Sequence, residues 1–594
     1  MKFFLSVLIA CFFASALAAE KPNIILFFTD DHGWPDIGAA GIYDDLKTPH
    51  IDQLVADGVR CTNGYVTAPQ CVPSRGGLLT GRDQSRFGLE TNGESLDGFN
   101  AEVKIGQRLQ KAGYKTGQTG KWHLGPGAEI ASHGFDEVYY KNSSKPAWAT
   151  FNLDGSDREP GYDESNLYHL DACTQAASAF IDRHGESPFF LYVAYRAPHV
   201  PLDAPRKYLS RFPGKMPERR RQALAMISAM DDGVGIIREK LEEKGLTGNT
   251  LIFFIGDNGA PLKIHKIDAP GGGPGWDGSL NAPMNGEKGM LAEGGIRVPF
   301  VAAWPGTIPA GQVYEEPVIS MDVAATAVAL AGLPHEGSLD GTNLIPYLAG
   351  EEKSSPHEAL FWRWSTQSAI RVGDWKFLRG GSREYLFNLV NDSGESRNLI
   401  EAHPEKAERM RRQLFEWTQE LSPPGLLGAQ MPGNWEQYYD HYLDGKPVSK
   451  KETERLSQPA TVQGWLARNS VIKESPRGLQ LIDPDGAKRL TPFIANSKLN
   501  LNGPFKVSME LTDLPEGELA VSWREKGQSD FVDSRVVMET GTQGALQVSG
   551  TVPTRAEVIH LRVLFPNGNA VIKSIQVNDL DGKVLQAWKF QQNN

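Results

Sequence analysis

Residues 71–81, Cys-Val-Pro-Ser-Arg-Gly-Gly-Leu-Leu-Thr-Gly, place a cysteine just before the expected start of a helix. Pro73 fixes the backbone in a turn, and Ser74 is a residue type that caps helix starts. Arg75 follows Cys71 by about one helical turn. A nucleophile at a helix N-terminus with an arginine one turn further on is typical of a site that handles an anion. A buried cysteine at a loop–helix junction is the alternative interpretation.

Polar side chains follow two short apolar stretches. The continuous apolar runs with the pattern of buried parallel strands are residues 23–28 and 250–255. The first is followed by Asp30 and Asp31, and the second by Asp257 and Asn258. Open α/β sheets bind their ligands beyond the carboxyl ends of the strands, and hard oxygen ligands suit a divalent cation such as calcium. A solvated turn at each strand end is the alternative.

The motif Cys-x-Pro-Ser-Arg followed by Leu-Leu-Thr-Gly-Arg resembles the signature of the type I sulfatases, the formylglycine-dependent branch of the alkaline phosphatase superfamily. Residues 120–125, Gly-Lys-Trp-His-Leu-Gly, and residues 288–299 resemble two further signatures of that family. The resemblance implies that a dedicated maturase oxidises Cys71 to formylglycine, an aldehyde. The metal ligands that it implies are Asp30, Asp31, Cys71, Asp257 and Asn258.

The same resemblance implies roles for side chains that face the sulfate. Lys121 would bind a sulfate oxygen, and His123 would contact the formylglycine hydroxyl. Residues 189–194 are predicted to form a strand, and His199 after it matches a family histidine close to the leaving oxygen. Lys288 matches the sulfate-binding lysine of the third signature. Taken alone, a surface lysine and a satisfied loop histidine are the ordinary interpretations of such residues.

The implied reaction is hydrolysis of a sulfate ester of an alcohol. A cation, calcium or else magnesium, would polarise the sulfuryl oxygens, and a hydroxyl of the hydrated aldehyde at residue 71 would attack sulfur. Asp257 is the expected base for this attack, and His199 or Lys288 the expected acid for the leaving oxygen. His123 would then take the proton from the second hydroxyl, which expels sulfate. The side chains expected to neutralise charge on the sulfate are Arg75, Lys121 and Lys288.

The N-terminus has the pattern of a secretory signal. One lysine precedes the apolar residues 3–13, and Ala-Leu-Ala at 16–18 is a small-x-small cleavage site, which assigns residues 1–19 to the signal. A lipoprotein signal with Cys11 as the lipidated residue is a minor alternative. The apolar run is too short to cross a membrane, and no later segment is a transmembrane candidate. We therefore expect an exported protein, periplasmic or secreted.

Charge and cysteine content exclude other classes. A net charge of −11 over 594 residues gives no indication of nucleic-acid binding. Beyond the signal only Cys61, Cys71 and Cys173 remain, too few for a disulfide scaffold. Once Cys71 is modified, Cys61 and Cys173 could pair, and the sequence leaves that question open.

The order of elements predicts an α/β fold with an appended all-β unit. Residues 20–425 are expected to form the catalytic domain, a large mixed sheet flanked by helices, which ends in a small four-stranded subdomain as in sulfatases. Residues 426–470 have the composition of a connector. Residues 471–594 contain short alternating runs between glycine and proline turns, which predicts a β-sandwich. Glycan binding and a packing or spacing role are equally consistent with this sandwich.

Export, the sandwich and a glycine- and proline-rich segment at 263–289 favour a sulfated polysaccharide or oligosaccharide as the substrate. Residues 276–281, Trp-Asp-Gly-Ser-Leu-Asn, resemble exported bacterial polysaccharide sulfatases, including those acting on algal galactans. Trp276 is a candidate sugar-stacking residue, and pinning of the loop is its alternative role. Alternatives for the whole protein are a formylglycine-dependent phosphodiester or phosphonate hydrolase and a non-catalytic glycan-binding relative. The second and third signatures favour sulfate.

Overall fold

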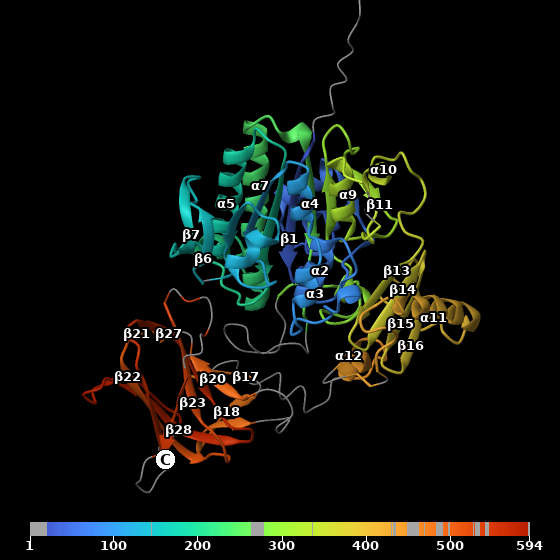
Figure 1. Ribbon diagram of the computed structural model, residues 1–594. Coiled ribbons are helices and arrows are strands. Elements are labelled where there is room, and N and C mark those ends of the chain that lie inside the picture. Colours follow the sequence, from blue (N-terminus) through green and yellow to red (C-terminus); the bar gives the residue numbers. More distant parts are fainter. Residues whose placement is uncertain are drawn as a thin grey trace, which may run out of the picture.

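A computed structural model describes residues 21–591 of the chain. Its described part excludes residues 144, 263–277, 335–336, 429, 432–434, 448–461, 469, 483–490, 497–498, 527, 529–530, 532–534 and 541–545. The signal segment with Cys11, and Trp276, therefore lie outside the described residues. Figure 1 shows an α/β unit and, beside it, an all-β unit formed by the C-terminal part of the chain.

A ten-stranded mixed sheet forms the centre of the α/β unit. In spatial order its strands are β11 (Gln312–Tyr314), β2 (Val59–Cys61), β10 (Phe300–Ala303), β9 (Thr250–Gly256), β1 (Asn23–Asp30), β8 (Phe189–Pro198), β4 (Lys115–Gly120), β5 (Glu137–Tyr140), β6 (Ala147–Phe151) and β7 (Asp157–Asp163). The strands β9, β1, β8, β4 and β5 run parallel. Thr29 pairs with Gly256 and Asp30 with Pro198, so the polar residues after these strands emerge at one edge of the sheet.

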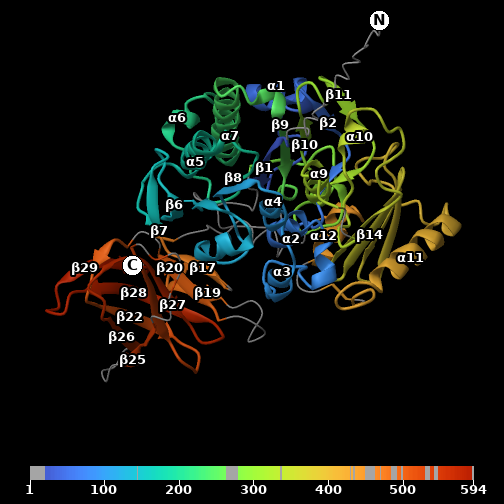
Figure 2. The same ribbon diagram turned by 45° about the horizontal axis from the view of Figure 1, so that its top comes forward.

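The central strand β1 is buried on both faces because helices cover both sides of the sheet. Ile24, Leu26 and Phe28 belong to one core, and Ile25 and Phe27 to the other. In Figure 2, α5, α6 and α7 lie on one side of β1 and β8, and α2, α4 and α9 on the other. The helices of this unit are α1 (Pro49–Ala56), α2 (Cys71–Thr80), α3 (Asp97–Ala101), α4 (Ile105–Lys111), α5 (His169–His184), α6 (Arg206–Leu209), α7 (Glu218–Glu243), α8 (Glu293–Ile296), α9 (Asp322–Leu330) and α10 (Ile345–Leu348).

A small antiparallel sheet follows the large one, as predicted. It contains β13 (Leu360–Trp364), β14 (Gln367–Val372), β15 (Trp375–Gly380) and β16 (Arg383–Asn388), and α11 (Pro404–Thr418) packs against it. The two-stranded pair of β3 (Gly64–Tyr65) and β12 (Val318–Ile319) completes the unit.

The segment predicted as connector contains a further helix, α12 (Trp435–Tyr442). Tyr438 and Tyr439 of this helix are buried in the same core as β1, and Tyr439 has no exposed surface. This part of the chain therefore packs on the α/β unit. Its aromatic residues drive the packing, since burying an aromatic side chain removes a large apolar area from water.

Two antiparallel sheets face each other in the C-terminal part and enclose their own core. One contains β17 (Leu466–Arg468), β20 (Phe493–Asn496), β21 (Leu501–Asn502), β23 (Ala520–Glu525), β24 (Arg535–Val537) and β27 (Glu557–Leu564). The other contains β18 (Val471–Ser475), β19 (Gly478–Ile482), β22 (Phe505–Asp513), β25 (Glu539–Thr540), β26 (Leu546–Val552), β28 (Ala570–Asn578) and β29 (Val584–Lys589). The predicted all-β fold of this part is confirmed.

Two further expectations bear on the whole chain. Among the described residues, no helix is both long enough and apolar enough to span a bilayer. Cys61 on β2 and Cys173 on α5 are buried free thiols that belong to different cores, so the structure does not pair them.

Candidate active site

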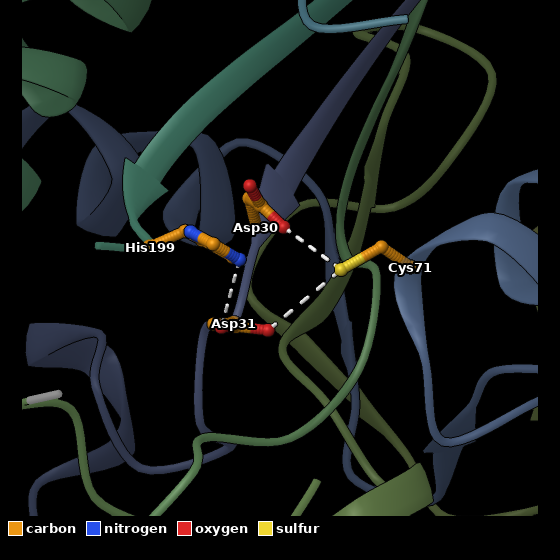
Figure 3. A group of neighbouring side chains, drawn as sticks. All are labelled: Asp30, Asp31, Cys71 and His199. Atoms are coloured by element: carbon orange, nitrogen blue, oxygen red, sulfur yellow. Dashed lines mark hydrogen bonds and ion pairs between the residues drawn. The ribbon is translucent and has the colours of Figure 1, made fainter. Parts of the chain in front are cut away.

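Cys71 is the first residue of α2 and is completely buried at the edge of the sheet where β1 and β9 end. All ten residues of α2 are buried, so the position of this helix is fixed by packing on every side. The Cys71 thiol lies 3.3 Å from Oδ1 of Asp30 and 3.9 Å from Oδ1 of Asp31. Figure 3 shows these three side chains and His199 pointing toward one another.

The predicted acidic residues meet at the ends of β1 and β9. The backbone N–H of Asp31 donates to Oδ1 of Asp257 at 3.0 Å, and the amide of Asn258 donates to Oδ1 of Asp31 at 2.7 Å. Asp31 has a φ of 59°, in the left-handed region, which aspartate adopts more readily than most residues. This turn brings Asp31, which follows β1, into contact with Asp257 and Asn258, which follow β9.

Four basic side chains surround the carboxylates. Lys121 lies 2.5 Å from Asp30, and Lys288 donates to Asp31 and, at 3.2 Å, to the sulfur of Cys71. His199 lies 3.5 Å from Asp31 through Nε2. Arg75 is the fourth basic residue, and its Nη2 lies 2.8 Å from Oδ2 of Asp257. Its Nη1 donates to the Tyr192 hydroxyl. Buried charges are stable only when paired in this way.

Burial and neighbouring charges shift the pKa values of these groups. Burial alone would raise the pKa of Asp30, but His199 and Lys121 hold it well below its usual range. The pKa of Asp257 is raised to about 7 by burial and by Asp30. Burial and then Asp257 raise the pKa of the Cys71 thiol, so an unmodified cysteine here would be a neutral, weakly nucleophilic group.

His123 and the glycine before Lys121 show how tightly the second signature is folded. Gly120 has a φ of 84°, and a Cβ there would lie 2.2 Å from the carbonyl oxygen of Ala194. His123 has a φ of 66°, in the left-handed region that is uncommon for non-glycine residues and is found more often at active sites. Burial and Lys121 lower the pKa of His123, and its Nδ1 has no hydrogen-bond partner among the described residues. The ring is therefore neutral.

The residues present fit a hard divalent cation. Ligand atoms of Asp30, Asp31, Cys71 and His199 all lie within 4.8 Å of one another. Oδ1 of Asn258, beside them, is buried and has no hydrogen-bond partner among the described residues. A buried carbonyl oxygen without a partner next to two carboxylates is the donor set that calcium or magnesium requires. Both oxygens of Asp257 already accept bonds, from the backbone of Asp31 and from Arg75.

Sequence reasoning missed the side chains that hold the loop of Lys288. The Tyr442 hydroxyl on α12 donates to Glu287 at 2.8 Å. Gln367 on β14 donates to the Gly289 carbonyl at 2.9 Å and accepts from the Leu291 N–H at 3.1 Å. These partners lie more than 70 residues from the loop in sequence, so no local pattern could reveal them. The loop that carries Lys288 is thus held by α12 and by the small sheet.

Replacing Tyr442 with phenylalanine is expected to lower kcat/KM for a sulfate ester by roughly 3- to 10-fold. The loss of one hydrogen bond to Glu287 is worth about 1 kcal/mol and loosens the loop of Lys288. Steady-state kinetics measures the effect, with Tyr162→Phe on the exposed surface of β7 as the control. A lower melting temperature with an unchanged kcat/KM would show that Tyr442 only stabilises the fold.

A second buried network, also missed, holds the residues that follow the segment 263–277. Arg220 on α7 donates to both oxygens of Asp36 and to the carbonyl of Gly278. Asp36 also accepts from the Ser279 hydroxyl, which in turn accepts from the backbone N–H of Gly33 at 3.0 Å. The turn after β1 is therefore hydrogen-bonded to Ser279, which lies in the glycine- and proline-rich segment 263–289.

The chain is similar to known proteins over most of its α/β unit. The profile of the Sulfatase family matches residues 22–333, and that of N-sulphoglucosamine sulphohydrolase, C-terminal, matches residues 286–421. The N-acetylgalactosamine-6-sulfatase of Mus musculus is 36% identical over 410 residues, which cover 63% of this chain and 74% of the mouse protein. An arylsulfatase of Hemicentrotus pulcherrimus is 34% identical over 389 residues, 60% of this chain and 67% of that protein.

A solved structure extends the similarity to the fold. Ps i-CgsB in complex with k-i-k-neocarrahexaose shares 30% sequence identity and a TM-score of 0.60, over 73% of this chain and 99% of that one. The matched Sulfatase profile spans the large sheet, α2 and the loop of Lys288. The chain belongs to the type I sulfatase family, with its alkaline phosphatase-like fold, and is a sulfuric ester hydrolase.

Proposed function

We propose that this enzyme hydrolyses sulfate esters of a carbohydrate, releasing inorganic sulfate, with a formylglycine at residue 71 and a divalent cation. The observation that carries the proposal is the set of contacts around Cys71. Its sulfur lies at a helix N-terminus within 3.3 Å of Asp30 and 3.2 Å of the ammonium of Lys288. A helix N-terminus and ammonium groups are suited to the sulfate anion, and the carboxylates to a cation.

The cation would be held by Asp30, Asp31, Asp257, Asn258 and residue 71; calcium is the expected ion and magnesium the alternative. When bound, it polarises the sulfuryl oxygens and lowers the pKa of the attacking hydroxyl. Formylglycine, once hydrated, offers one hydroxyl that attacks sulfur and a second whose deprotonation expels sulfate and restores the aldehyde. A serine would lack the second hydroxyl and could not be regenerated in this way.

The chain's own groups move the protons. Asp257 takes the proton of the attacking hydroxyl, and His199 or Lys288 protonates the leaving alcohol oxygen. Both candidates lie against Asp31, His199 at its Oδ2 and Lys288 at its Oδ1. His123, neutral and with a free Nδ1 among the described residues, takes the proton of the second hydroxyl.

Three cations balance the charge that develops on the sulfate oxygens. Lys121 and Lys288 are the direct sulfate ligands in this proposal, since each reaches the carboxylates beside Cys71. Arg75 is fully buried and hydrogen-bonded to Asp257 and Tyr192. In this proposal its charge stabilises the sulfate through space, without direct contact. Trp276 remains the proposed stacking residue for a sugar ring.

Galactose-type sugars are the first candidates for the substrate. A relative in mouse is named N-acetylgalactosamine-6-sulfatase, and a similar solved structure is a complex with k-i-k-neocarrahexaose. We further propose an exported protein that depends on a formylglycine maturase. Its domains would be the signal at 1–19, the catalytic domain at 20–425, a connector at 426–470 that contributes α12, and the sandwich at 471–594.

The test is release of inorganic sulfate from a panel of sulfated glycans, intact and enzymatically shortened, by protein co-expressed with a maturase. Mass spectrometry of the peptide with residue 71 verifies conversion of the cysteine. Sulfate from galactose-type glycans supports the proposal. No sulfate from any glycan, together with turnover of a phosphodiester or phosphonate by the converted protein, would favour the alternative hydrolase.

A further inference from the structure

The helix α11 covers the outer face of the small four-stranded sheet (Figure 1). Ile370, Phe377 and Leu386 of that sheet pack against α11. Ala369 and Leu378, on its other face, belong to the core that contains β1. The sheet therefore separates α11 from the catalytic centre, and features on this helix take no part in the reaction described above.

A groove of about 310 Å³ lies between α11 and β15. Trp375 and Met410 line it with apolar surface, and Lys406, Arg409 and Arg412 line it with positive charge. The ammonium of Lys406 lies 3.7 Å from the centre of the Trp375 ring, so a cation–π contact holds it at the groove. Arg409 and Arg412 are exposed, and the groove is therefore open to an anion from solution.

The three cations of the groove have no ion-pair partner in the part of the chain that the structure describes. No carboxylate oxygen of that part lies within 4.0 Å of the charged groups of Lys406, Arg409 and Arg412. The neighbouring Arg411 on the same helix, by contrast, pairs with Glu384 at 2.6 Å. None of the described residues that line the groove is acidic. Its positive charges are therefore available to an anion that the protein does not itself supply.

The spacing of these cations suits an anionic polymer. They recur at every third position of α11, and residues three apart on a helix are neighbours, with about 5–6 Å between their Cβ atoms. The glutamates of the helix do not line the groove: Glu405, Glu408 and Glu416. The whole chain carries a net charge of −11, so this row is a local concentration of positive charge. A row of cations can hold a chain of anionic groups at several points at once.

We infer that the groove between α11 and β15 binds a second stretch of a sulfated polysaccharide, outside the active site. This inference rests on the proposed function, because the sulfated glycan is the anionic polymer which that function brings to the enzyme. Guanidinium groups bind sulfate oxygens with two parallel hydrogen bonds, and the ammonium of Lys406 adds a further charged donor. Attachment at α11 keeps the polymer on the enzyme between turnovers and raises its effective concentration at the active site.

The kinetic test compares a long sulfated polysaccharide with a disaccharide of the same backbone, which is too short to reach from the active site to α11. In the double variant Arg409→Gln/Arg412→Gln, KM for the polysaccharide should rise about fivefold with kcat unchanged, and the kinetics on the disaccharide should stay at wild-type values. Arg409→Lys/Arg412→Lys keeps both charges and should keep most of the wild-type affinity. The matched control, Lys111→Gln/Lys115→Gln, removes two exposed cations near the start of β4 and should leave KM unchanged.

Affinity electrophoresis separates this inference from the proposed function. The Cys71→Ala chain, which should not turn over, is expected to be retarded in a gel that contains a sulfated galactan, but not in a gel with the same galactan after desulfation. Adding Arg409→Gln/Arg412→Gln should remove a large part of this retardation, whereas adding Lys111→Gln/Lys115→Gln should not. No difference between the two pairs, or an equal rise of KM for polysaccharide and disaccharide, would overturn the inference. Absence of sulfate release by the converted wild-type enzyme, with retardation that still depends on Arg409 and Arg412, would contradict the proposed function alone.

Discussion

Replacing Cys71 with alanine is expected to reduce sulfate release at least about a thousandfold, because the residue that becomes the nucleophile is removed. The fold should survive, since the change deletes one sulfur atom from a helix that is packed on all sides. Sulfate release and the thermal unfolding midpoint, measured on the same preparations, give the two readouts.

Cys61→Ala is the matched control for this experiment. Cys61 is also a fully buried free cysteine, but it lies on β2 and contacts none of the predicted site residues in the described interactions. The control should retain activity within about twofold. Appreciable turnover by the Cys71→Ala enzyme would contradict the assignment of residue 71 as the formylglycine nucleophile.

Asp257→Ala and Asn258→Ala should each remove the metal and lower kcat at least about a hundredfold. Both side chains come from the turn after β9 and contact Asp31, so each replacement removes an oxygen ligand from the same position. Metal content by elemental analysis and kcat for a sulfated glycan are measured together. The control is Asp182→Ala on α5, where the carboxylate pairs with Lys244 instead.

The two variants should differ when excess calcium is added. Asn258→Ala loses a ligand and a hydrogen bond to Asp31 but no group proposed to transfer a proton, so a high cation concentration should restore part of its activity by mass action. Asp257→Ala also loses the proposed base and the partner of Arg75, so it should stay inactive. Unchanged metal content in both variants would refute their assignment as ligands.

The chemistry of the site could be predicted from local patterns because the motifs are short and lie where strands end. The apolar runs before Asp31 and Asp257 predict two buried parallel strands, and parallel strands bring their carboxyl ends to one edge. The structure places these residues, Cys71 and His199 together at that edge. Trp276 lies outside the described residues, and its role stays a prediction.

Other features of the site depend on contacts between residues far apart in sequence. Nothing local indicates that Tyr442 holds the loop of Lys288, since the two elements meet only when α12 packs on the core.

The sequence by itself determined the order of elements, the family and the residue types of the reaction centre, because periodicity, turn chemistry and short motifs are local properties of a chain. Only the tertiary structure decided which charges pair, which buried polar atoms of the site have no partner among the described residues, and that part of the predicted connector belongs to the catalytic core. Pairing and burial depend on distances between segments separated by up to several hundred residues, and those distances are set by packing of the whole chain.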